Sequence, residues 1–91
     1  MSYTKDNIPK ELIKAARFIS EDKLKKAEPI LRGYLKDYPL DVNAMKLLGD
    51  IGVKFRAYKD AGYLFSRALD LSPEYDEARL SYANLLYKRQ L

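Results

Sequence analysis

The chain repeats its own pattern at an interval of 34 residues, and this period limits the fold more than any other feature. Ala27 coincides with Ala61 one interval later, and Pro39 coincides with Pro73. Small residues occupy three further positions that are one interval apart: Ala15, Gly49 and Ala83. A fixed period of this length indicates a supersecondary unit that stacks against copies of itself, because one unit cannot bury its apolar face alone.

Apolar residues recur with helical spacing along the whole chain. Asp41 can cap a helix, because its carboxylate can accept from exposed first-turn amides. Pro39 and Pro73 each end the helix before them, because the residue preceding proline avoids the α region. Short breaks around 21–22 and 56–58 favour antiparallel neighbours. We therefore expect an all-α fold with five helices, at roughly 9–20, 23–37, 42–55, 58–71 and 76–89.

The third expected helix is apolar on two faces, which indicates neighbours on both sides, as in a stacked solenoid. The residues on these faces are Met45, Leu48, Gly49 and Gly52 on one side and Ala44, Leu47, Ile51 and Phe55 on the other. The small residues at positions 15, 49 and 83 would let paired helices cross closely. Pro29, inside the second helix, predicts a kink near 25–29 or a later helix start.

Within residues 42–75, Leu48 and Gly49 are followed by Ala61, Phe65 and Pro73. In this order and spacing they resemble the tetratricopeptide repeat (TPR) family, whose pattern is W-x₂-L-G-x₂-Y…A-x₃-F…P. Met45 and Gly52 stand where the family has tryptophan and tyrosine. The resemblance implies a right-handed α-solenoid of antiparallel helix pairs. It would form a single domain over 1–91, with repeats at 8–41 and 42–75 and a half repeat at 76–91, or about two and a half repeats.

The composition excludes several kinds of chemistry. Without cysteine or histidine, the chain lacks thiolate nucleophiles, zinc sites and the commonest general base, so we expect no enzyme activity, no cofactor and no metal. The net charge is only +4, and basic residues interleave with acidic ones, so we do not expect a nucleic-acid partner. No apolar run approaches the ~18 residues of a membrane span, so we expect a cytoplasmic protein with no membrane partner.

The resemblance also implies a concave groove lined by the first helix of each repeat. Helix faces left free by packing, related by the 34-residue interval, supply its lining. The candidate groove residues are Leu12 from the first helix, Asn43, Lys46, Asp50 and Lys54 from the third, and Leu80, Asn84, Tyr87 and Lys88 from the fifth. The amides can pair with a peptide backbone, the lysines offer charge to carboxylates, and Tyr87 offers a flat apolar surface. We expect a non-catalytic protein–protein interaction module that binds a peptide or helix.

Some TPR proteins use this groove to clamp the C-terminal carboxylate of heat-shock chaperones with lysines, asparagines and an arginine. The positions that correspond to that clamp are Leu12, Ala16, Leu47, Glu77 and Ser81. They do not supply the required donors, and Glu77 would repel a carboxylate. We therefore expect no chaperone-tail binding of that kind.

The last expected helix spreads apolar residues around its circumference, although a terminal capping helix is usually polar outside. A large exposed apolar patch usually marks an interface, so one alternative is a homodimer through Tyr82, Leu85 and Leu86. Another is that the chain is the N-terminal regulatory or assembly segment of a larger enzyme. Residues 27–49 resemble repeats at the N-terminus of some bacterial sulfotransferases.

Overall fold

Five α-helices make up most of residues 8–90, the part of the chain that the computed structural model describes, and this range contains no strand. The helices are α1 (Lys10–Ser20), α2 (Leu24–Asp37), α3 (Val42–Lys54), α4 (Tyr58–Leu71) and α5 (Asp76–Arg89). Each boundary lies within one residue of the expected one, so the all-α class is confirmed. None of these five helices is both long and apolar enough to cross a membrane.

The two short turns, α1–α2 and α3–α4, have the same construction one 34-residue interval apart. Asp22 and Arg56 each have a φ of 60°, in the left-handed region. This conformation lets amides beyond the helix reach its last carbonyls, as in a Schellman motif. The closing bonds join Lys23 N to Phe18 O at 2.7 Å and Ala57 N to Gly52 O at 2.8 Å. Sequence reasoning located both turns but not this geometry, because neither left-handed residue is a glycine.

The two longer turns, α2–α3 and α4–α5, also repeat. Their first bonds join Tyr38 N to Tyr34 O and Ser72 N to Ala68 O, both at 2.9 Å. Asp41 caps α3 as expected, because its Oδ1 accepts the Ala44 amide at 3.0 Å. Tyr75 holds the equivalent position before α5 but makes no side-chain cap bond. The hydrogen bonds of all four turns therefore follow the sequence period.

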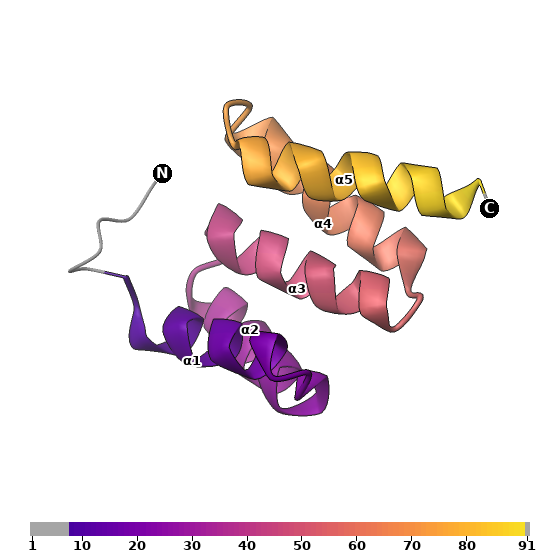
Figure 1. Ribbon diagram of the computed structural model, residues 1–91. Helices are drawn as coiled ribbons and strands as arrows, with labels where there is room; N and C mark the ends of the chain where they lie inside the picture. The colour runs from indigo at the N-terminus through magenta and orange to yellow at the C-terminus, as the bar shows by residue number, and fades with distance from the viewer. Residues whose placement is uncertain (1–7, 91) are drawn as a thin grey trace.

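Helix α3 lies in the middle of the structure, with α1 and α2 on one side and α4 and α5 on the other (Figure 1). It is buried on two faces, as its apolar pattern predicted. Gly49 allows the close approach of α4, because a Cβ at this position would lie 2.5 Å from Phe65 Cε1. Ala15, at the equivalent position one interval earlier, is also fully buried. Ala83, one interval later, is exposed because α5 has no helix on its outer side within residues 8–90.

Pro29 does not interrupt α2, which is continuous from Leu24 to Asp37. The helix starts one residue later than expected, and Pro29 lies in its second turn. Proline removes the amide that would bond the carbonyl four residues earlier, on Lys25. Both residues are exposed, so water can satisfy that carbonyl and the helix continues.

Candidate binding groove

A hollow with a volume of about 520 Å³ lies where the first turns of α1, α3 and α5 come together. These helices pack side by side, α1 against α3 and α3 against α5. The N-terminal ends of three helices and the residues that precede them therefore converge on one surface. The residues that line the hollow are Ile8, Leu12, Ile13, Ala16, Asn43, Lys46, Leu47, Tyr75 and Glu77.

The floor of the hollow is apolar. Leu12 is 3% exposed and also belongs to the core between α1, α2 and α3, so this side chain cannot move without disturbing the fold. Leu47 is half-buried beside it, and Ile13 is 47% exposed at the rim. Ala16 is exposed and too small to close the space. The hollow can therefore accept an apolar side chain without rearrangement of the backbone.

Three polar groups on α3 set the charge along this face. Lys46 Nζ lies 2.7 Å from Asp50 Oδ2, one helical turn away, and the two side chains are only 17% and 25% exposed. Each charge therefore compensates the other, and Lys46 does not present the free point charge that its sequence position indicated. Asn43 is half-buried at the edge of the hollow, where its amide offers both a donor and an acceptor.

Residues before and within the first turn of α5 complete the wall. Burial, together with the carboxylates of Glu77, Asp50 and Asp41, raises the pKa of Tyr75 to about 12. Its phenol is protonated at neutral pH, as any tyrosine is, and can donate a hydrogen bond. Glu77 is exposed and has no ion-pair partner among residues 8–90, so it gives this wall a negative charge.

The structure places only part of the expected groove in this hollow. Leu12, Asn43 and Lys46 line it, and Asp50 pairs with Lys46 next to it. The remaining candidates do not line the hollow: Lys54, Leu80, Asn84, Tyr87 and Lys88. All five are exposed, and Leu80 and Tyr87 are 64% and 65% accessible. The predicted groove residues therefore fall into three places: the hollow, the exposed end of α3 at Lys54, and an exposed part of α5.

Two of the three residues expected at an oligomer surface belong to the core. Leu85 is fully buried in a cluster with Ala61 and Phe65, so its assignment to a surface is wrong. Tyr82 is half-buried, with its ring centroid 6.4 Å from that of Phe65. Only Leu86 is exposed, at 44%. The 34-residue period could have predicted the burial of Leu85. One interval earlier lies Ile51, an apolar residue that faces the core from α3.

The hollow also includes residues outside the expected stripe. Ile13 and Leu47 are one interval apart and lie beside Leu12 and Lys46, which are also one interval apart. The 34-residue period could therefore have predicted both as lining residues. The period could not have predicted Tyr75 as a lining residue. The equivalent residue one interval earlier is Asp41, which caps α3 and does not line this hollow. Four of the five positions compared with the chaperone clamp line the hollow: Leu12, Ala16, Leu47 and Glu77.

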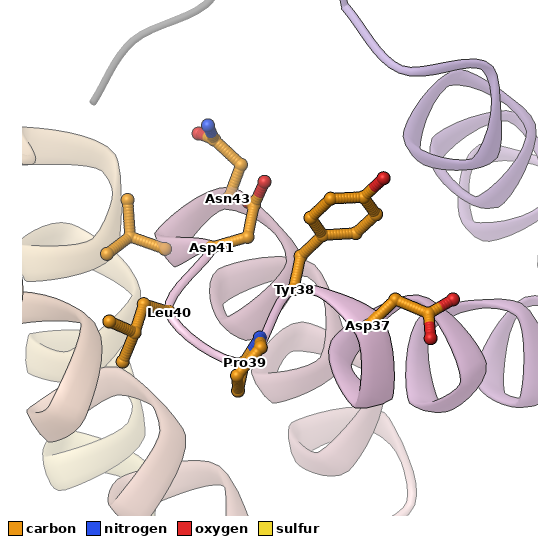
Figure 2. Close-up of a pocket in the computed structure, with 7 residues that line it drawn as sticks. Asp37, Tyr38, Pro39, Leu40, Asp41 and Asn43 are labelled. Carbon is orange, nitrogen blue, oxygen red and sulfur yellow. The ribbon is translucent and has the colours of Figure 1, made fainter.

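A second hollow, of about 360 Å³, lies at the α2–α3 turn. Figure 2 shows Tyr38 and Leu40 projecting to opposite sides of this turn, with Pro39 between them. Both are more than half exposed. Seven consecutive residues, 37–43, make up its lining, so the site depends on one connection rather than on converging helices. Asn43 lines both hollows and lies at their border.

No known protein family, curated protein or solved structure matches this chain.

Proposed function

We propose that the chain is a non-catalytic interaction module of the TPR type, which binds an extended or helical segment of another protein in the hollow between α1, α3 and α5. The observation that carries this proposal is the convergence of three helix ends on an apolar floor with a polar rim. Binding sites for peptides and small ligands combine such a floor with a few polar groups that fix orientation.

The proposed ligand inserts one large apolar side chain against Leu12 and Leu47. Complete burial of a leucine-sized side chain is worth about 1.5–3 kcal/mol. The Asn43 amide then pairs with a peptide group of the ligand, and the Tyr75 hydroxyl can donate to a carbonyl. Glu77 disfavours an acidic ligand and favours a lysine or arginine next to the apolar anchor.

The TPR type of arrangement is supported by the turns. Backbone hydrogen bonds recur at the same 34-residue interval as the residues, in both the short and the long connections. Gly49 and Phe65 meet where the TPR pattern places its glycine and phenylalanine. A solenoid of stacked pairs presents the first helices of its repeats side by side, which would bring the first turns of α1, α3 and α5 to one binding site.

Selection from a random peptide library tests this proposal. We expect selected peptides to share an apolar residue with a neighbouring basic residue. Ala16→Arg should reduce their affinity at least about tenfold, because the new side chain fills the hollow. Ala83→Arg is the matched control, since it makes the same change at an exposed helical alanine outside the hollow. Equal binding by the wild type and Ala16→Arg would contradict the proposal.

A further inference from the structure

The outward side of α5 carries an apolar stripe that no other described helix covers. Leu80, Ala83 and Tyr87 are all exposed, and their spacing of three and four residues places them on one face. Leu86 adjoins this stripe and is 44% exposed. The opposite side of the helix faces the core through Ala78 and Leu85. Thus α5 has a second apolar face in addition to the one that holds it in the domain.

The pattern of this face is self-complementary when the helix is reversed. Leu80 and Tyr87 lie on either side of Ala83, two helical turns apart. Glu77 and Lys88 are eleven residues apart, which is three turns, so they share one flank of the stripe. The midpoint of each pair falls within one residue of Ala83. A two-fold axis at Ala83 would therefore bring Leu80 of one chain to Tyr87 of another.

The same axis would bring Glu77 of each chain beside Lys88 of the other, which gives two equivalent ion pairs. Neither residue has an ion-pair partner among residues 8–90, whereas the neighbouring Asp76 is already paired with Arg79 at 2.6 Å. Glu77 precedes Lys88 along the helix, so only the antiparallel arrangement joins opposite charges at both ends. Charges that flank an apolar seam set the orientation of paired helices in this way.

We propose that the protein forms a two-fold symmetric homodimer in which α5 packs antiparallel against α5 of a second copy, with Ala83 at the centre. The small side chain of Ala83 allows the two helices to approach closely. Leu80 and Tyr87 supply the apolar contact on either side, and the Glu77–Lys88 pairs fix the direction. One helix pair is smaller than a standard interface, so the dissociation constant should be on the order of 0.1 mM.

Sedimentation equilibrium of the full chain measures this association directly. The average mass should rise from that of one chain toward that of two as the concentration passes about 0.1 mM. Ala83→Arg should keep the protein monomeric, and circular dichroism would establish that this variant is folded. Ala16→Arg, the matched change in the hollow, should dimerise as the wild type does. A wild type that stays monomeric at about ten times that concentration overturns the proposal, as does dimerisation by Ala83→Arg.

Charge exchange tests the antiparallel geometry without touching the apolar stripe. Lys88→Glu should weaken dimerisation about tenfold, because two attractive pairs become two repulsive ones. Adding Glu77→Lys restores opposite charges at both ends and should return the association to within about twofold of the wild type. A double variant as weak as Lys88→Glu alone would overturn this arrangement. Because Lys88 does not line the hollow, its reversal separates dimerisation from peptide binding.

Discussion

The change Gly49→Ala should destabilise the protein, although alanine is the better helix former. A methyl group at this position would lie 2.5 Å from Phe65 Cε1 and 2.9 Å from two other ring atoms. The Phe65 ring is fully buried and cannot swing into solvent, so the added methyl overpacks the α3–α4 contact. Overpacking costs about 1–3 kcal/mol, and three close contacts favour the upper half of that range, about 2–3 kcal/mol. Alanine recovers about 1 kcal/mol of helix propensity.

We therefore expect Gly49→Ala to lower the free energy of unfolding by about 1–2 kcal/mol. Gly33→Ala is the matched control, because it is also inside a helix but has no atom within 4 Å of the added methyl. It should stabilise the protein by about 0.5–1 kcal/mol. Urea unfolding followed by circular dichroism measures both values. A Gly49→Ala variant as stable as Gly33→Ala would refute the close α3–α4 packing.

Three further changes test the turns and the wall of the hollow. Arg56→Gly should raise the free energy of unfolding by about 0.5–1 kcal/mol, and Asp22→Gly by less, because aspartate tolerates the left-handed region better. An Arg56→Gly variant no more stable than the wild type would count against the left-handed conformation at position 56. Asp41→Ala should cost at least about 1 kcal/mol, because Asp41 Oδ1 accepts the Ala44 amide and its Oδ2 accepts the Tyr34 hydroxyl. Asp41→Asn keeps the acceptor for the Ala44 amide and should cost less; equal losses would argue against the cap. Because the folded pKa of Tyr75 is about 12 and its unfolded pKa about 10, its contribution is present below pH 10 and is lost as the pH rises through 12. The wild type should therefore lose more stability over that interval than Tyr75→Phe in urea titrations, and parallel losses would contradict the burial of this phenol.

The helices could be predicted almost completely because their ends carry local chemistry. Asp41 caps α3 through its own carboxylate, and Pro39 follows the end of α2 because proline is incompatible with the helix before it. Such signals act over a few residues and do not depend on tertiary contacts. The left-handed conformation of Arg56 carries no such signal, because the residue is an arginine and not the glycine or asparagine that usually adopts it.

The candidate site was only partly predictable, because it depends on which face of each helix is buried. On α3 the 34-residue period and the two apolar faces indicate which side is buried, and Asn43 and Lys46 from the remaining side line the hollow. On α5 apolar residues occur on all sides, so the pattern itself does not show that Leu85 faces the core. The pairing of Lys46 with Asp50 was also missed, because both side chains fit a free binding face equally well in the sequence.

The most direct test of the proposed binding function is the affinity of one selected peptide for three proteins: the wild type, Ala16→Arg and Ala83→Arg. Fluorescence anisotropy at protein concentrations below about 0.01 mM keeps self-association out of the measurement. Binding in the hollow predicts at least about tenfold weaker affinity for Ala16→Arg and no change for Ala83→Arg. Unchanged affinity for Ala16→Arg, or a loss confined to Ala83→Arg, would contradict a binding site between α1, α3 and α5.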